Sequence, residues 1–278
     1  MEVRLHASVD EFRATAEPLY RRDPVGHTIE LTLLGANTFP DDSFLMTAWD
    51  NGRAVAAALQ TPPYPLACNG IPVTMIEPVV AHLARLRPDL DGVRGARDTA
   101  LAFADSWRGV TGRSGTVTTE ERLYRLGTLY TPTGVAGSPR AATEHDRDLL
   151  IKWVQLFFDE AFGQSRNGDG AEFVEGAAQG GHRFVLWEVD GTPVSTAMLR
   201  IPAFGVSRIG PVFTPSTQRG RGYGSAVTAA AADLAHRDGT PDVVLFADLA
   251  NPTSNAIYQR IGFEAVADSV RIDFRSLG

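Results

Sequence analysis

The segment "TPSTQRGRGYGSAVTAAAADLA", residues 214–235, places three glycines and two arginines between an apolar run and an alanine-rich stretch. The apolar run before it, "RIGPVFTP" (208–215), predicts a β-strand that ends at Pro215. The alanine-rich stretch carries small and apolar residues at helical spacing, and Gly239 and Pro241 predict the end of that helix. The order is therefore strand, glycine-rich loop and helix, which predicts an α/β fold.

The loop has the chemistry of an anion site. Glycines let the backbone turn tightly and let amide N–H groups approach a ligand with no Cβ in the way. A helix N-terminus adds about half a positive charge. We therefore expect this loop to hold phosphate, with the arginine side chains screening its charge; the alternative is a flexible turn that is only rich in glycine. The residues concerned are Arg219, Gly220, Arg221, Gly222, Tyr223, Gly224 and Ser225.

Two of three known phosphate loops do not match. A mononucleotide P-loop needs Gly-Lys followed by Ser or Thr, and the loop has no lysine. A dinucleotide-binding G-x-G-x-x-G loop opens a sheet that continues after it, whereas fewer than 60 residues follow Gly220. The third pattern, R-x-x-G-x-G, fits Arg219 to Gly224.

That pattern resembles the pyrophosphate loop of the GNAT superfamily of coenzyme A-dependent N-acetyltransferases. The following segment, "VVLFADLANPTSNAIYQRIGFEAV" (243–266), is similar to the family's next strand and helix, with an Asn, a Tyr seven residues later and then Gly-Phe. The resemblance covers about residues 140–278 and extends to the branch often labelled predicted acetyltransferases. It implies acetyl-CoA as co-substrate. We expect no metal, because the six histidines show no metal-ligand spacing.

The resemblance also implies roles for individual residues. The main chain of Val212 and Phe213 would pair with the pantetheine arm of the cofactor, and the side chains of Asn251 and Asn255 would hydrogen-bond to it. Tyr258 would act as general acid, giving a proton to the thiolate that leaves when an amine attacks the acetyl group.

The stretch "ANPTSNAIYQRIGF" (250–263) has a purely local interpretation as well. Asn251 can cap a helix, Pro252 suits the first helical position and Gly262 can end the helix. The residues Asn251, Asn255, Tyr258 and Gly262 are spaced 4, 3 and 4, so they share one helical face. The sequence shows no clear general base: Glu188 and Asp248 are candidates, and the base stays unassigned.

The chain also repeats itself. The stretches 43–64 and 183–204 each predict a hairpin, because Asn51-Gly52 and Asp190-Gly191 favour tight turns. We further pair 88–112 with 215–239, and 120–132 with 254–266.

These pairs predict two tandem acetyltransferase-fold domains, each a mixed twisted sheet flanked by helices. The first, residues 1–135, is degenerate, since acidic Asp89 and Asp91 stand where the second copy has Ser216 and Gln218. The second, residues 136–278, carries the function. We place the boundary within "TPTGVAGSPRAA" (131–142), and we expect the helix that opens the second copy to bury Leu149, Leu150, Trp153, Phe157 and Ala161 on one face.

Composition narrows the function classes. The formal net charge of −7 argues against a general nucleic-acid binder, and the single cysteine, Cys68, excludes an internal disulfide. No apolar run reaches the length of a membrane span and no signal peptide is recognisable, so we expect a cytoplasmic protein that binds no membrane. The histidines show no metal-ligand spacing.

The predicted function is acetyl-CoA-dependent N-acetyl transfer to an amine of a small molecule or peptide. Two alternative functions stay open: a non-catalytic acyl-CoA-binding or regulatory module, and a dinucleotide oxidoreductase. Assembly as a homodimer also stays open.

Overall fold

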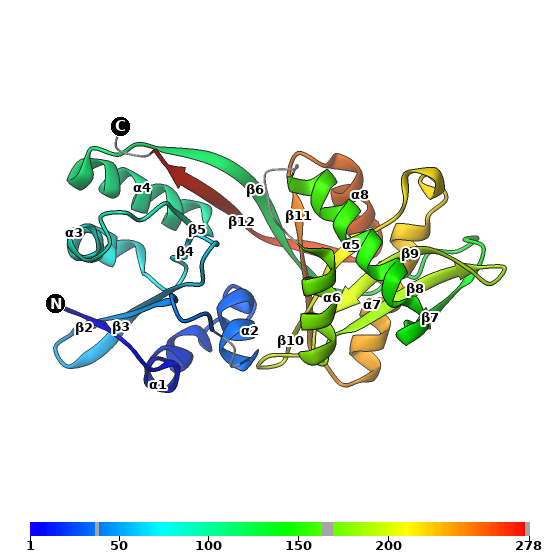
Figure 1. Ribbon diagram of the computed structural model, residues 1–278, viewed down its shortest axis with the longest axis horizontal. Coiled ribbons are helices and arrows are strands. Elements are labelled where there is room, and N and C mark those ends of the chain that lie inside the picture. Colours follow the sequence, from blue (N-terminus) through cyan, green and yellow to red (C-terminus); the bar gives the residue numbers. More distant parts are fainter. Residues whose placement is uncertain (37–38, 163–168, 276–278) are drawn as a thin grey trace. The chain divides into compact units, whose positions relative to one another are not determined.

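The computed structural model describes residues 1–36, 39–162 and 169–275. The contacts between Cα atoms divide the chain into two units (Figure 1). Unit 1 comprises Met1–Leu123, Ala247–Ala250 and Val266–Gly278, and unit 2 comprises Tyr124–Phe246 and Asn251–Ala265. The last strand of the chain therefore contributes to both units. The sequence boundary expected between residues 135 and 136 stays a prediction.

The two halves of the chain repeat one order of elements. The first half contains β1 (Glu2–Leu5), α1 (Val9–Tyr20), α2 (Thr28–Ala36), β2 (Phe44–Asp50), β3 (Arg53–Gln60), β4 (Leu66–Ala67), the 3₁₀ turn η1 (Val73–Met75), α3 (Ile76–Leu86), β5 (Gly92–Ala96), α4 (Arg97–Thr111) and β6 (Gly115–Leu126).

The second half contains β7 (Ser138–Ala141), η2 (Glu144–Asp146), α5 (Arg147–Phe162), α6 (Gly170–Gln179), β8 (Arg183–Val189), β9 (Thr192–Leu199), β10 (Val206–Phe213), η3 (Ser216–Gln218), α7 (Tyr223–Arg237), β11 (Asp242–Asp248), α8 (Pro252–Arg260) and β12 (Phe263–Phe274). Apart from the added turn η2, each element has a counterpart in the first half.

The strands form one mixed 12-stranded sheet, to which both units contribute. In unit 1 the strand order is β1-β2-β3-β4-β5-β12-β6, and in unit 2 it is β6-β11-β10-β9-β8-β7. The pairing is antiparallel except at one place in each unit, where β4 runs parallel to β5 and β10 runs parallel to β11. This confirms the predicted tandem architecture of mixed sheets flanked by helices.

The hairpins form as predicted. Asn51 and Gly52 have φ of 47° and 74°, and Asp190 and Gly191 have φ of 48° and 75°. Positive φ at both turn residues matches the twist of the flanking strands. The β2–β3 and β8–β9 hairpins both shift register close to the turn, at Ala48/Trp49 and at Trp187/Glu188.

The other two predicted pairs of repeats are wrong, because each pairs a segment with one that lies one element away from its true counterpart. Residues 120–126 belong to a strand whereas residues 254–260 are helical, and the stretch 88–112 holds β5 and α4 whereas 215–239 holds a loop and α7. In chain order, α3 is the counterpart of α7 and α4 is the counterpart of α8. The stretch Cys68–Met75 thus occupies the place of the glycine-rich loop, and Asp89 and Asp91 do not.

The core of unit 1 is closed by the end of the chain. Val270, Ile272 and Phe274 of β12 are buried in it together with residues of α3 and α4. The ring of Phe274 stacks against Trp107, with 5.4 Å between centroids. The first half of the chain therefore depends on the last strand for a complete core.

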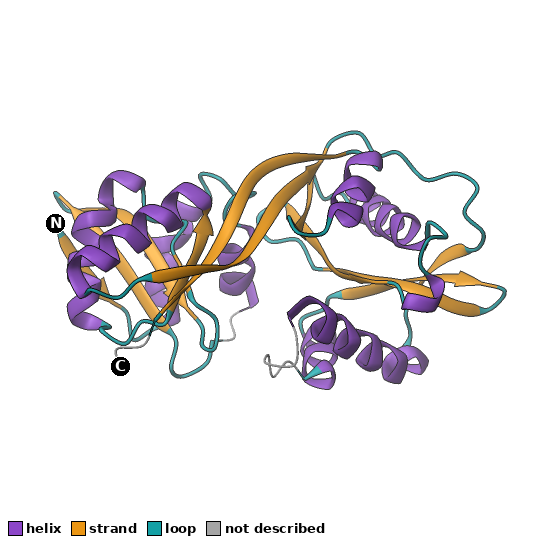
Figure 2. Ribbon diagram, turned by 90° about the horizontal axis from the view of Figure 1, so that it is seen from above, coloured by secondary structure: helices purple, strands orange, loops and turns teal. Residues whose placement is uncertain are grey.

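The core of unit 2 lies between α5, α6 and the sheet. Leu150 and Trp153 are buried as predicted, Leu149 and Phe157 pack against the same cluster, and Ala161 is exposed instead. Helix α7 contacts β8, β9 and β10, and Figure 2 shows helices on both faces of this sheet. Strand β10 and helix α7 are therefore held in place by packing against each other and against β8 and β9.

Candidate active site

Strand β10 separates from β11 before either strand ends. The parallel pairing runs from Val206↔Asp242 to Ile209↔Leu245, yet the strands continue to Phe213 and Asp248. On its other side, β10 stays paired to β9 at Val212↔Ala197 and Phe213↔Thr196, after a shift in register. Along the part of the chain that the structure describes, Val212 and Phe213 thus lie in a stretch without pairing to β11.

The glycine-rich loop follows this stretch directly. Gly220 and Gly222 have φ of 78° and 83°, in the left-handed region that a side chain rarely adopts. None of the amide N–H groups from Gly220 to Ser225 donates a hydrogen bond within the described residues. Successive amides around left-handed residues form a concave anion-binding nest. We call the main-chain amides of Gly220–Ser225 the amide nest.

Contacts around the amide nest hold it in shape. Gln218 donates its amide to the carbonyl of Pro215 at 2.8 Å, and the Thr228 hydroxyl donates to the carbonyl of Gly224 at 2.7 Å. A Cβ on Gly222 would lie 2.9 Å from Cγ2 of Val135, whereas a Cβ on Gly220 would meet open space. Both glycines are required by backbone conformation, and Gly222 is also required by close packing.

The other predicted binding residues of the loop play different parts. The side chain of Tyr223 is buried, so this residue offers a ligand its amide alone. Arg219 donates to the carbonyl of Thr214 at 2.9 Å and forms an ion pair with Glu160 of α5. Arg221 is exposed and forms no ion pair within the described residues. Of the two arginines, Arg221 is the one with an uncompensated charge.

Helix α8 has the predicted caps. The Asn251 side chain accepts from the Ser254 amide at 3.0 Å, Pro252 is the first helical residue, and Gly262 follows the helix with φ of 102°. The amide of Asn255 is also engaged within the protein: its Nδ2 donates to the Asn251 carbonyl at 2.8 Å. The contacts of Asn251 and Asn255 with pantetheine stay predictions. In such a complex, each side chain would bind pantetheine as well as its present partner within the protein.

Tyr258 is partly buried on α8. Its ring has two aromatic neighbours, with 6.4 Å to the centroid of Tyr124 and 6.2 Å to that of Phe263. No hydrogen-bond partner of its hydroxyl is found in the described part of the chain. Burial raises the pKa of Tyr258 to about 12. This phenol is therefore protonated at neutral pH and has a proton to donate.

Tyr124 of β6 was not found by sequence reasoning. It is fully buried, its hydroxyl donates to Oδ1 of Asn255 at 2.8 Å, and Nε2 of Gln259 donates to that hydroxyl at 3.3 Å. A single tyrosine in a strand carries no local signal of such contacts, because its partners lie 131 and 135 positions away.

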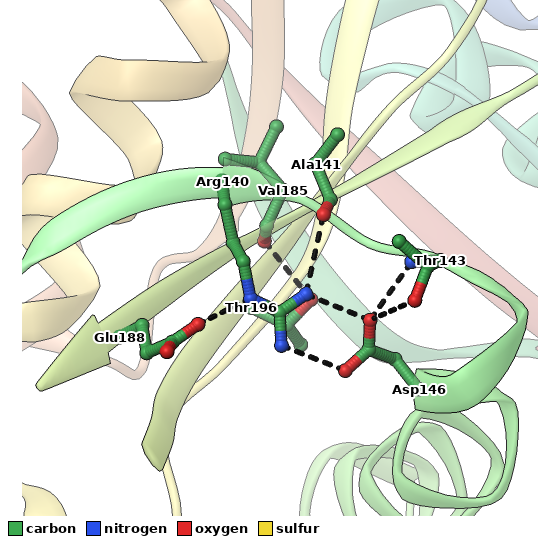
Figure 3. A network of polar contacts seen from close by, with 7 residues as sticks. All are labelled: Arg140, Ala141, Thr143, Asp146, Val185, Glu188 and Thr196. Atoms are coloured by element: carbon green, nitrogen blue, oxygen red, sulfur yellow. Dashed lines mark hydrogen bonds and ion pairs between the residues drawn. The ribbon is translucent and has the colours of Figure 1, made fainter. Parts of the chain in front are cut away.

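The two carboxylates considered as bases are engaged elsewhere. Glu188 forms an ion pair with Arg140, which also binds Asp146 through two hydrogen bonds of 2.7 and 2.8 Å (Figure 3). Arg140 and the amide and hydroxyl of Thr143 hold the pKa of Asp146 well below its usual range. Asp248 accepts from the Ala250 amide at 2.7 Å. The general base stays unassigned.

Other functional groups are accounted for. Cys68 is fully buried, and burial raises the pKa of its thiol to about 12, so the thiol stays protonated at neutral pH. Within residues 1–36, 39–162 and 169–275, no group of three His, Cys, Asp or Glu side chains could hold a metal ion. Over the same ranges, every helix is too short or too polar to span a membrane.

Comparison with known proteins agrees with this geometry. Residues 147–263 match the model of the Acetyltransferase (GNAT) family. This range contains strand β10, the amide nest and α8, and it is the part of the chain that matches a GNAT acetyltransferase domain. No curated protein matches the chain.

Solved structures show the fold of the whole chain. An acetyltransferase of the GNAT family from Colwellia psychrerythraea is 10% identical with a TM-score of 0.65, covering 99% of this chain and 100% of its own. A GCN5-related N-acetyltransferase from Sphaerobacter thermophilus is 16% identical with a TM-score of 0.62, covering 98% and 95%. A tandem GNAT protein from the clavulanic acid biosynthesis pathway is 13% identical with a TM-score of 0.61, covering 100% and 99%. The chain therefore shares the fold of these proteins over nearly its whole length, including that of the tandem GNAT protein.

Proposed function

We propose that unit 2 transfers the acetyl group of acetyl-CoA to an amine of a small molecule or peptide. The observation that carries this proposal is the amide nest at the N-terminus of α7, whose N–H groups have no acceptor among the residues that the structure describes. Unpaired amides and the helix dipole both favour a bound anion, and the diphosphate of coenzyme A is such an anion. The adjoining stretch of β10 at Val212 and Phe213 would pair with the amides of the pantetheine arm.

The chemistry follows a direct attack. The neutral amine nitrogen attacks the carbonyl carbon of the thioester and forms the new C–N bond. The resulting tetrahedral intermediate collapses with cleavage of the C–S bond, and the amine nitrogen loses a proton to water. Tyr258 donates its phenolic proton to the sulfur as the thiolate leaves, and the phenolate then takes back a proton from water. Such positioned proton transfer contributes about 10²- to 10⁴-fold to the rate.

Unit 1 has a different part in this proposal. Its loop at Cys68–Met75 lacks the glycine pattern of the amide nest. We therefore assign acetyl-CoA to unit 2 alone and give unit 1 a structural or substrate-shaping role.

The test combines binding and turnover. Calorimetry with acetyl-CoA should show binding to the wild-type protein and to Tyr258→Phe with similar affinity. A panel of amines assayed by release of free thiol should find an acceptor, and Tyr258→Phe should lower kcat for it by at least about 100-fold. Because burial raises the pKa of Tyr258 to about 12, ionisation of this group should not reduce kcat below about pH 11.

Different results separate the alternatives. Binding without thiol release from any amine would favour the acyl-CoA-binding module. Stabilisation by NAD with no effect of acetyl-CoA would favour an oxidoreductase. An unaltered kcat in Tyr258→Phe would exclude this residue as the general acid.

A further inference from the structure

The buried hydroxyl of Tyr124 on β6 forms hydrogen bonds with two residues of helix α8. Tyr124 donates to Asn255 Oδ1 at 2.8 Å and accepts from Gln259 Nε2 at 3.3 Å. Asn255 and Gln259 are four positions apart, so they lie on one face of α8. Two attachments on one face, one turn apart, restrict both rotation of the helix about its axis and movement along it.

The same side chain also contacts the proposed acid. The rings of Tyr124 and Tyr258 lie 6.4 Å apart at 59°, and the ring of Phe263 lies 6.2 Å from that of Tyr258. Phe263 is 2% exposed and Tyr124 is fully buried, so both neighbours of Tyr258 are held by the core. The position of the Tyr258 ring therefore depends on where Tyr124 holds α8.

We propose that Tyr124 is a positioning residue for acetyl transfer, whose two hydrogen bonds hold α8 at the rotation that presents the Tyr258 hydroxyl to the leaving thiolate. This inference rests on the proposed function of Tyr258. Tyr124 acts through Tyr258 and α8, and its own hydroxyl is occupied by the helix. A displacement of about 1 Å in a reacting group can lower a rate by about 100-fold.

The test is a double-mutant cycle in the full chain. Tyr124→Phe keeps the ring against Tyr258 and removes both hydrogen bonds. We expect kcat to fall about tenfold or more and KM for acetyl-CoA to change much less than kcat, because the amide nest is untouched and only Asn255, among the predicted cofactor contacts, loses a partner. The double variant Tyr124→Phe/Tyr258→Phe should be no slower than Tyr258→Phe, since Tyr124 has no effect on the rate once the acid is gone.

A structural role would give another pattern. If the losses in kcat of the two single variants multiply in the double variant, Tyr124 acts independently of Tyr258 and the proposal is overturned. An unchanged kcat in Tyr124→Phe overturns it as well, while leaving the acid role of Tyr258 intact if Tyr258→Phe is impaired. An unimpaired Tyr258→Phe overturns both proposals.

Two further variants guard against a general loss of folding. Tyr20→Phe removes another fully buried tyrosine hydroxyl, in unit 1, that has no hydrogen-bond partner in the described residues, and should leave kcat unchanged. Gln259→Ala removes only the longer bond to Tyr124 from an exposed position and should lower kcat about twofold to threefold. If Tyr124→Phe does not fold, an unchanged kcat in Gln259→Ala overturns the proposal.

Discussion

The loops after β4 and after β10 occupy the same place in the two halves of the chain but differ in backbone. The loop of unit 2 has glycines at positive φ, and its amide nest has no acceptor in the described part of the chain. In the loop of unit 1, Cys68–Met75, all of which the structure describes, no residue has positive φ. Pro72 has no amide hydrogen, and the amides of Cys68, Ile71 and Met75 donate to the carbonyls of Arg94, Cys68 and Pro72.

Two loops at the same place in the order of elements therefore differ in whether they can bind an anion. In unit 1, buried Cys68 and Ile71 fill the loop with apolar atoms, and a Cβ on Gly70 would lie 2.4 Å from the carbonyl oxygen of Ala57. That loop therefore packs inward. In unit 2 the left-handed glycines turn the amides away from internal partners. The contrast lies in backbone conformation and in hydrogen bonds, and the order of elements is unchanged.

The largest expected effect concerns the core of unit 1. Phe274→Ala removes a buried ring that stacks on Trp107, and we expect the free energy of unfolding to fall by about 3–5 kcal/mol. Denaturant unfolding measures this loss. Val266→Ala, at an exposed position of the same strand, should change it by less than about 0.5 kcal/mol.

We expect Phe274→Ala, in unit 1, to leave acetyl-CoA affinity nearly unchanged at temperatures where the variant is folded, because the amide nest belongs to unit 2. A parallel loss of affinity would show that the two units do not act separately.

The next effect tests the glycines of unit 2. Gly222→Val introduces a side chain at positive φ and against Val135, and acetyl-CoA affinity should fall about 100-fold. Gly220→Ala has the same backbone strain but open space around the new Cβ, so a loss of about tenfold is expected. Val73→Ala in the loop of unit 1 is the control and should stay within twofold. Equal losses in all three variants, measured by calorimetry, would break the comparison.

The smallest effect separates the two arginines. Arg221→Gln should weaken acetyl-CoA binding about fivefold at low salt, and less at high salt, because an exposed charge is screened. Arg219→Gln should weaken binding only about twofold, since Glu160 already compensates this charge. A larger loss for Arg219→Gln than for Arg221→Gln would show that the ion pair with Glu160 opens when the cofactor binds.

Much of the fold was predictable because its signals are local. Asn-Gly and Asp-Gly at the hairpins, the Asn251 cap with Pro252 and the alanine-rich helix α7 each depend on neighbouring residues, and each formed as expected. The pairing of the repeats failed because helical periodicity does not say which helix of a repeat a segment represents. Strand pairing and the order of elements were needed to align α4 with α8.

The sequence by itself determined the glycine-rich loop, its arginines and the acetyltransferase resemblance. Glycine adopts a left-handed backbone readily and arginine carries a positive charge, so both properties follow from residue type alone. Only the tertiary structure decided that β12 completes the core of unit 1, that Glu188 is held by Arg140, and that Tyr124 binds the face of α8 next to Tyr258. These contacts join residues far apart in the chain, and their geometry is set by how strands pair and helices pack.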